Sequence, residues 1–247
     1  SSDLGLVVAG TTGEYYSQEK DERLQLMKTC KEVIGNRLPF VVGTGAIRTE
    51  DSVFFAEEAA KVGADAILVS TSPYALPTER ENALHALAID RAANLPIMLY
   101  NYPGRTGAMM GAEYLDRVAR SSNFCAIKES SGDIDRLHLL ARDYSHIQLC
   151  CGMDDQALEF FAWGVNCWVC AGSNFAPEAH VALYQTNASL TLSQVNMAAH
   201  LVRVHLTTVI SYVKSKKLSV FTVYWSVSSA VISLKLSVAK ATQVKTC

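Results

Sequence analysis

The feature that most limits the fold is a regular alternation of two kinds of segment from Leu4 to Gly172. Short apolar runs that end in glycine or polar residues alternate with longer stretches whose apolar residues have helical spacing. The first kind is typical of buried strands and the second of helices that face a core. This alternation predicts a parallel sheet covered by helices. Seven strands are predicted, over residues 4–9, 39–45, 64–70, 96–101, 124–128, 146–151 and 166–172.

The spacing of these strands, about 30 residues, suits a (β/α)8 TIM barrel better than an open sheet. No glycine-rich dinucleotide fingerprint follows the first strand, which argues against a Rossmann fold. We therefore predict an α/β fold, an incomplete (β/α)8 TIM barrel with a C-terminal extension. Residues 1–184 are expected to form the catalytic barrel domain and residues 185–247 an atypical extension.

The extension is unusual in composition, because no acidic residue, glycine or proline occurs after Glu178. Its apolar spacing permits a helix over 190–212, and its β-branched residues favour strands over 218–227 and 230–239. Its basic residues leave open the alternative that it binds an anionic surface.

The net charge of -2 argues against nucleic acid as a partner, since phosphate binding needs a basic surface. No long apolar span and no signal-peptide pattern is visible, so no membrane partner is expected. The cysteines number seven and lie mostly inside apolar runs, which favours reduced thiols in a cytoplasmic protein.

Lys128 ends the apolar run 124–127 and is followed at once by polar residues. In a barrel, chemistry occurs at the carboxyl ends of the strands. Desolvation in such a place lowers the pKa of an ammonium group in general, and the neutral amine can then attack a carbonyl group. The alternative is a lysine whose alkyl chain packs at the strand end while its charge stays in water.

Other strand ends carry polar residues that could complete a site. Tyr100 ends the preceding strand and could transfer protons, or it could simply pack its ring. Thr11 and Thr12 offer hydroxyls and backbone N–H groups that could bind an anion, although the stretch could equally be an ordinary turn. Arg105 follows a Pro-Gly turn and could bind a carboxylate, or remain a solvated loop charge.

Three stretches together resemble the dihydrodipicolinate synthase / N-acetylneuraminate lyase family. They are Gly-Thr-Thr-Gly-Glu at 10–14, Tyr-Asn-Tyr-Pro-Gly-Arg-Thr-Gly at 100–107 and Ile-Lys-Glu-Ser-Ser-Gly-Asp at 127–133. The resemblance extends from about Leu4 to Tyr184 and is specific, because the three motifs occur in the right order on successive predicted strand ends.

The resemblance implies a class I, Schiff-base lyase or aldolase that condenses or cleaves pyruvate, or a related 2-oxo acid, with an aldehyde. Lys128, Tyr100 and Thr12 would be the catalytic residues. The substrate-binding residues would be Thr11, Arg105, Gly152 and Val169. No metal or organic cofactor is implied, because the imine on Lys128 itself serves as the electron sink of the reaction. The implied partners are small molecules and further copies of the chain in a dimer or tetramer.

Two departures keep alternatives open. Ala75 stands where the synthase branch has the second tyrosine of a pair, which favours a sister dehydratase or deaminase acting on hydroxylated 2-oxo acids or sugar acids. The first strand–helix unit of the family is expected to be missing, and an open barrel would leave unpaired strand edges. An alternative of another class is therefore an inactive relative that acts as a binding protein.

The pair Cys167-x-x-Cys170 resembles a metal or redox motif, but it lies in an apolar run without a second pair. A metal site is therefore not predicted.

Overall fold

The computed structural model describes residues 4–186, which belong to two compact units that divide between Val169 and Cys170. The helix predicted over 190–212 and the strands over 218–227 and 230–239 lie outside the described residues. So does the predicted extension 185–247 apart from its first two residues. The domain boundary after residue 184 stays a prediction.

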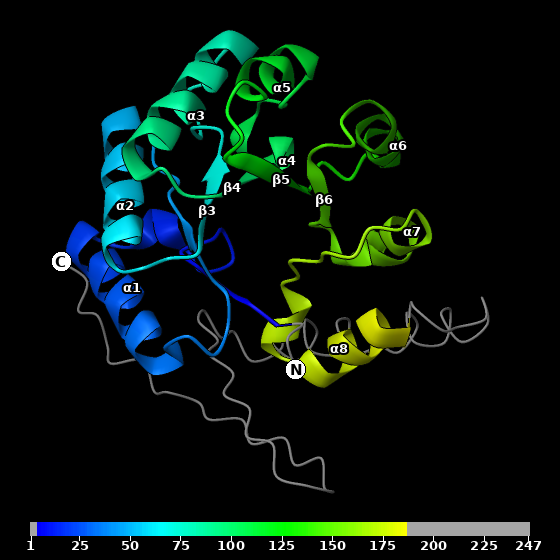
Figure 1. Ribbon diagram of the computed structural model, residues 1–247, viewed down its shortest axis with the longest axis horizontal. Helices are drawn as coiled ribbons and strands as arrows, with labels where there is room; N and C mark the ends of the chain where they lie inside the picture. The colour runs from blue at the N-terminus through cyan, green and yellow to red at the C-terminus, as the bar shows by residue number, and fades with distance from the viewer. Residues whose placement is uncertain (1–3, 187–247) are drawn as a thin grey trace, which may run out of the picture. The chain divides into compact units, whose positions relative to one another are not determined.

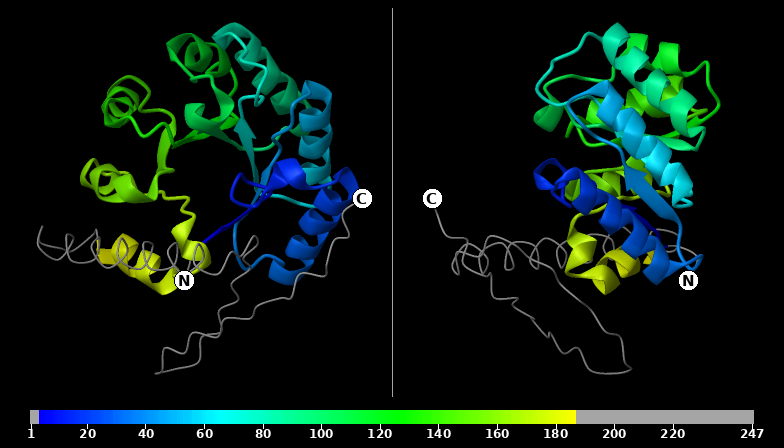
Figure 2. Two further views of the ribbon diagram at one scale, coloured as in Figure 1. Left: turned by 180° about the vertical axis from the view of Figure 1, so that it is seen from behind. Right: turned by 90° about the vertical axis from the view of Figure 1, so that its left-hand side faces the viewer.

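The first unit is built on a six-stranded parallel sheet whose strands are adjacent in chain order. This sheet confirms the predicted α/β fold of the TIM-barrel type. Its curved row of strands has helices along the outer side (Figures 1 and 2). The strands are β1 (Leu6–Val8), β2 (Phe40–Gly43), β3 (Ala66–Ser70), β4 (Ile97–Asn101), β5 (Phe124–Glu129) and β6 (Gln148–Cys151).

A helical segment follows each strand, which is the predicted alternation. The α-helices of the first unit are α1 (Lys20–Ile34), α2 (Thr49–Lys61), α3 (Glu79–Ala93), α4 (Pro103–Thr106), α5 (Ala112–Val118), α6 (Ile134–Asp143) and α7 (Ala157–Ala162), with 3-10 turns η1 (Tyr15–Ser17) and η2 (Asp154–Gln156). The second unit contains the 3-10 turn η3 (Gly172–Asn174) and α8 (Pro177–Thr186).

Local sequence explains where the longer helices begin and end. Helix α3 starts with a capping box, in which the Thr78 side chain accepts a hydrogen bond from the Glu81 backbone N–H, and the Glu81 carboxylate accepts one from that of Thr78. Such a box satisfies two backbone donors that the first helical turn leaves unpaired. The same helix ends at Asn94 in the left-handed conformation, with φ 48°.

The main core lies between the strands and the helices. Its largest fully buried members include Met27, Phe40, Ile67, Ile97 and Leu99. Burying one such side chain stabilises the fold by about 1.5–3 kcal/mol. This packing holds the strand ends, and the polar residues that follow them, in fixed positions.

The seventh predicted strand, 166–172, is not formed as a strand. A single parallel bridge joins Trp168 to Cys151, supported by the backbone bonds Cys151 N–H to Cys167 O (2.8 Å) and Val169 N–H to Cys151 O (3.0 Å). The run is divided between the two units after Val169, and Gly172 already belongs to η3. Too few residues therefore continue along β6 to make a strand.

No helix within residues 4–186 is both long and apolar enough to cross a lipid bilayer.

Candidate active site

Lys128 and Tyr100 face each other across two adjacent strands. Lys128 is the penultimate residue of β5 and is paired in register with Tyr100, the penultimate residue of β4. Side chains in register on neighbouring parallel strands lie on the same face of the sheet. The Lys128 Nζ atom lies 4.3 Å from the centre of the Tyr100 ring. At that distance the ring face attracts the ammonium charge.

Tyr100 is 7% exposed, and its phenol is tuned by several neighbours. Burial raises the pKa of Tyr100 above its ordinary value, and a hydrogen bond with the Thr11 side chain opposes this shift. The positive charge of Arg105 also lowers the pKa of Tyr100, more weakly. The phenol therefore stays protonated at neutral pH, with a hydroxyl group beside it that can pass a proton on.

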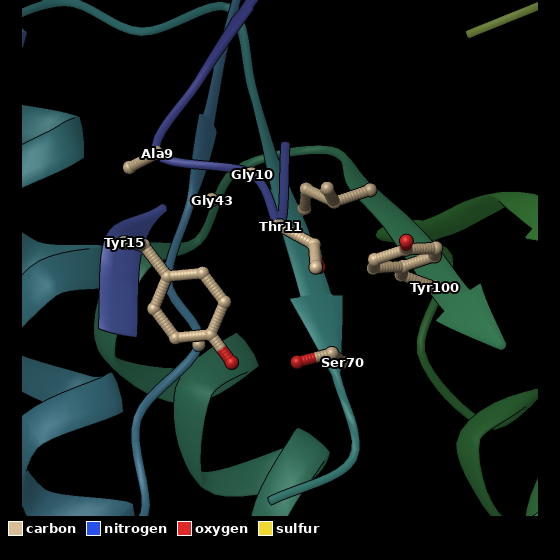
Figure 3. Close-up of a pocket in the computed structure, with 9 residues that line it drawn as sticks. Ala9, Gly10, Thr11, Tyr15, Gly43, Ser70 and Tyr100 are labelled. Atoms are coloured by element: carbon tan, nitrogen blue, oxygen red, sulfur yellow. The ribbon is translucent and has the colours of Figure 1, made fainter. Parts of the chain in front are cut away.

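A pocket at these strand ends is lined by four hydroxyl-bearing side chains. Thr11, Tyr15, Ser70 and Tyr100 surround the same space (Figure 3). The other residues that line it are Ala9, Gly10, Gly43, Gly45 and Leu68. Burial raises the pKa of Tyr15, while the nearby Arg23 charge and a hydrogen bond with Ser70 lower it. The pocket thus offers hydrogen-bond donors and acceptors but no carboxylate.

Arg23 packs beside Tyr15, the second tyrosine of the pocket. Its side chain is 2% exposed and donates hydrogen bonds to the carbonyls of Gly45 (2.8 Å) and Gly43 (2.5 Å). Its guanidinium also lies 3.8 Å over the Phe55 ring and 5.1 Å from the Tyr15 ring centre. A Cβ on Gly45 would come within 3.0 Å of the Tyr15 ring, so the glycine leaves the room that this ring occupies.

The two threonines of the first motif are placed differently. Thr11 is half-buried and hydrogen-bonded to Tyr100, whereas Thr12 is exposed. Arg105 is exposed on α4 and lies 5.9 Å over the Tyr102 ring, which also bonds it and raises the pKa of Arg105. The rings of Tyr102 and Tyr100 are 5.8 Å apart. Arg105 is therefore linked to the site through Tyr102.

Gly152 lies directly against the lysine. Its N–H donates to the Glu129 carbonyl at 2.9 Å, and an added Cβ would lie 2.9 Å from Lys128 Cε and would overlap the Ser130 hydroxyl. Only glycine leaves room for the lysine chain at this point. Val169, the last residue of the first unit, is half-buried and bonded through its N–H to Cys151.

A buried polar network fixes the residues that follow Tyr100 and Lys128. The Glu129 carboxylate accepts hydrogen bonds from Asn101 Nδ2 (2.8 Å and 3.0 Å) and from the Ser131 N–H (2.8 Å), and Arg136 forms an ion pair with it at 3.5 Å. The Asn101 carbonyl oxygen of the side chain accepts from the Met110 N–H at 3.0 Å. The ends of β4 and β5 are thereby tied together immediately behind the two facing side chains.

Tyr15, Ser70 and this network were not predicted from the sequence. Two signals were available: Tyr15 directly follows the Gly-Thr-Thr-Gly-Glu motif, and Ser70 is the last residue of a predicted strand. Within residues 4–186 no cluster of His, Cys, Asp or Glu side chains is arranged to bind a metal ion.

A lysine and a tyrosine thus lie side by side at the strand ends of a parallel, barrel-type sheet. This arrangement places the chain among α/β proteins with a candidate imine-forming site. The chain belongs to the Dihydrodipicolinate synthetase family, whose sequence profile matches residues 2–229.

Two relatives illustrate the similarity. The chain is 38% identical over 167 residues to a 4-hydroxy-tetrahydrodipicolinate synthase of Desulforudis audaxviator, which covers 66% of this chain and 56% of that protein. It is also 38% identical over 183 residues to the same enzyme of an Exiguobacterium species, covering 72% and 61%. The chain thus spans about three fifths of the length of these relatives.

Solved structures agree with the fold. The chain is similar to a chloride-inhibited dihydrodipicolinate synthase of Acinetobacter baumannii complexed with pyruvate, with TM-score 0.76, 30% identity, and coverage of 83% of this chain and 71% of that one. A dihydrodipicolinate synthase of Thermotoga maritima gives TM-score 0.74 at 31% identity, with coverage of 82% and 70%.

Proposed function

We propose that this chain acts as a Schiff-base lyase that joins pyruvate, or a related 2-oxo acid, to an aldehyde. The observation that carries the proposal is the contact between Lys128 Nζ and the Tyr100 ring at adjacent strand ends. The names of the relatives and the pyruvate in the Acinetobacter structure support the choice of substrate class.

In the proposed reaction, the neutral amine of Lys128 attacks the ketone carbon of the 2-oxo acid. The resulting carbinolamine loses water to form an imine, and a positioned acid–base group must move protons at that step. Tyr100 is proposed for this role, with Thr11 as its proton relay because the two are hydrogen-bonded. The imine then withdraws electrons, so an adjacent C–H bond ionises to an enamine, which attacks the aldehyde carbon. Water finally releases the product from Lys128.

The remaining predicted residues would bind the substrates and shape the site around the lysine. Backbone N–H groups around Thr11 and Thr12 are proposed to hold the pyruvate carboxylate. Arg105 is proposed to bind a carboxylate of the second substrate, since a guanidinium fits a carboxylate in two parallel hydrogen bonds. Gly152 would give the lysine and its adduct room, and Val169 would border the site. The reaction needs no cofactor, because the imine is the electron sink.

A second candidate, a dehydratase or deaminase acting on hydroxylated 2-oxo acids or sugar acids, is favoured by one observation. Ala75 is an exposed methyl group beside Tyr74, which is 90% exposed, where the synthase branch has a second tyrosine. Both candidates begin with the same imine on Lys128. They differ in the bond that the enamine forms or breaks.

The test is a turnover assay with a panel of substrates. Pyruvate consumption is measured with several aldehydes, and loss of the substrate is measured with hydroxylated 2-oxo acids and sugar acids. The proposal expects turnover with at least one aldehyde, and none in the Lys128→Ala variant. Turnover on sugar acids alone would favour the second candidate, and activity that survives Lys128→Ala would contradict both.

Association into a homodimer or homotetramer is proposed from the family resemblance. Light scattering of the purified chain measures the molar mass, and a monomer at all concentrations would contradict it.

A further inference from the structure

Two thiols lie side by side in the strand next to the lysine. Cys150 on β6 is paired in register with Lys128, and Cys167 is the neighbour of Cys150 across the bridge that joins Cys151 to Trp168. The two Sγ atoms are 2.9 Å apart. Both side chains are reduced thiols, Cys150 fully buried and Cys167 half-buried. Tyr100, Lys128, Cys150 and Cys167 therefore form one row across the face of the sheet.

The backbone geometry at this pair suits a disulfide. Neighbouring strands lie about 4.8 Å apart, which is within the range of Cα separations, about 4.4–6.8 Å, that a disulfide spans. Hydrogen bonds on both sides of Trp168 hold the two segments in register. The sulfurs are within about 1 Å of the bonded length of about 2.05 Å. Closing the bond requires only a small side-chain movement.

The two thiols differ in accessibility and acidity. Burial raises the pKa of Cys150, an effect that the nearby Lys128 charge opposes. A hydrogen bond with Cys150 lowers the pKa of Cys167. Because a thiolate is the nucleophile in thiol–disulfide exchange, the more exposed and more acidic Cys167 is suited to attack first. Cys150, held against it, is suited to complete the exchange.

We propose that Cys150 and Cys167 are a redox-active dithiol beside Lys128, which closes to a disulfide on reaction with a low-molecular-weight disulfide such as oxidised glutathione. The Cys167 thiolate attacks one sulfur of the oxidant and releases one thiol. Cys150, after losing its proton, then attacks the Cys167 sulfur of this mixed disulfide and releases the second thiol. The protein loses two electrons and two protons, and one disulfide becomes two thiols.

The bond would act on the lysine through its neighbours. Gly152 follows Cys150 by two residues and lies against Lys128 Cε, and Val169 follows Cys167 by two residues. Even a small movement of the two sulfurs changes the packing beside the lysine, because Cys150 is its register partner. We expect borohydride trapping of pyruvate on the oxidised protein to slow several-fold and to recover with dithiothreitol. This expectation rests on the proposed function, whereas disulfide formation does not.

Peptide mapping of the full chain tests the bond itself. The protein is incubated with oxidised glutathione, the remaining thiols are alkylated, and the protein is digested without reduction. Trypsin alone is unsuitable, because no lysine or arginine occurs between Arg142 and Arg203. Cleavage after Glu159 separates Cys150 from Cys167, and cleavage after Trp168 separates Cys167 from Cys170. We expect the peptide with Cys150 to be joined to the peptide that ends at Trp168. Formation of the bond removes two hydrogens, so it lowers the intact mass, measured before alkylation, by about 2 Da.

Single variants identify the two cysteines that form the cross-link. The cross-link should disappear in Cys167→Ala and Cys150→Ala and persist in Cys151→Ala and in the control Cys125→Ala, which alters an exposed cysteine. Cys167 is the principal variant, since its half-buried side chain tolerates truncation better than Cys150. A stable glutathione adduct without a cross-link, a Cys167–Cys170 bond or a cross-link that survives Cys167→Ala would each overturn the proposal. Mapping requires no turnover, so its failure is distinct from failure of the proposed function.

Discussion

Lys128 and Tyr100 are register partners on β5 and β4, and the lysine Nζ lies 4.3 Å from the tyrosine ring centre. The strand pairing fixes this relationship, because residues in register on a parallel pair point to the same side. The lysine is thus held over an aromatic face with a phenolic hydroxyl at its edge. Three single substitutions test what this arrangement does and what supports it.

Tyr100→Phe removes the hydroxyl and keeps the ring that contacts Lys128. Loss of a positioned acid–base group should slow turnover by about 10²-fold or more, with little change in stability. Steady-state kinetics with the best substrate of the panel measure the effect. Tyr144→Phe is the matched control. Tyr144 follows the last residue of α6, and its hydroxyl donates to Asp116 on α5, away from the proposed reaction. Equal losses in the two variants would remove Tyr100 from the mechanism.

Gly152→Ala places a methyl group where Lys128 Cε and Ser130 Oγ already lie. Overpacking of this kind costs about 1–3 kcal/mol, and here it displaces the lysine chain. We expect the rate of imine trapping with pyruvate to fall by about tenfold or more while the protein stays folded. Gly5→Ala serves as control, since its added Cβ meets Pro39 at an ordinary 3.5 Å. An unchanged trapping rate in Gly152→Ala would show that this contact does not position Lys128.

Glu129→Gln tests the network behind the site. The carboxylate is 2% exposed and receives donors from Asn101, Ser131 and Arg136. The amide removes the negative charge that pairs with the buried guanidinium of Arg136, and it directs an NH₂ group toward another donor. The free energy of unfolding should fall by about 3–5 kcal/mol, as for other broken buried pairs. Urea unfolding measures it.

The matched control for this change is Glu113→Gln, which breaks the exposed pair of Glu113 with Arg117. Exposed pairs contribute less than about 1 kcal/mol, so the control should unfold almost as the parent does. Similar losses in both variants would mean that the buried network has no special role.

Much of the fold could be predicted from the sequence, because the elements depend on local patterns. Helix α3 begins at Glu79 and ends at Ala93 because of local signals, namely the Thr78–Glu81 capping box and the left-handed turn at Asn94. The run 166–172 carried the same apolar signal as the true strands. The predicted strand did not form, because strand formation there depends on partners that local sequence does not specify.

The site was predictable to a smaller extent. Lys128, Tyr100 and Gly152 stand at strand ends, where chain order alone brings them to one edge of the sheet. Tyr15 and Ser70 could not be paired from the sequence, because 3-10 turn η1 and strand β3 meet only through the curvature of the sheet. The contact between Cys150 and Cys167 likewise required the register of Cys151 with Trp168.

Tyr114→Phe tests the pH dependence of stability. The Tyr114 ring is fully buried, and its hydroxyl has no hydrogen-bond partner among the described residues. Burial raises the pKa of Tyr114 far above the value of about 10 for an unfolded chain. The folded state therefore holds the phenolic proton more tightly than the unfolded state does. The contribution of this difference to the free energy of unfolding is complete below about pH 10 and is lost as the pH rises further.

The variant lacks this ionisation and the unpaired buried hydroxyl. Its free energy of unfolding should exceed that of the parent by about 1 kcal/mol at neutral pH. The difference should widen by about 1.4 kcal/mol by pH 11. Denaturant unfolding at both pH values measures it, with the exposed Tyr74→Phe as control. A constant difference would contradict the assignment.

The most direct test of the account is borohydride reduction of the reduced protein in the presence of pyruvate, followed by tandem mass spectrometry. We predict a stable mass increase, equal to one reduced pyruvate imine, on Lys128 alone, and none in Lys128→Arg. An adduct on another lysine, or no adduct in a folded protein, would contradict the claim that Lys128 forms the imine.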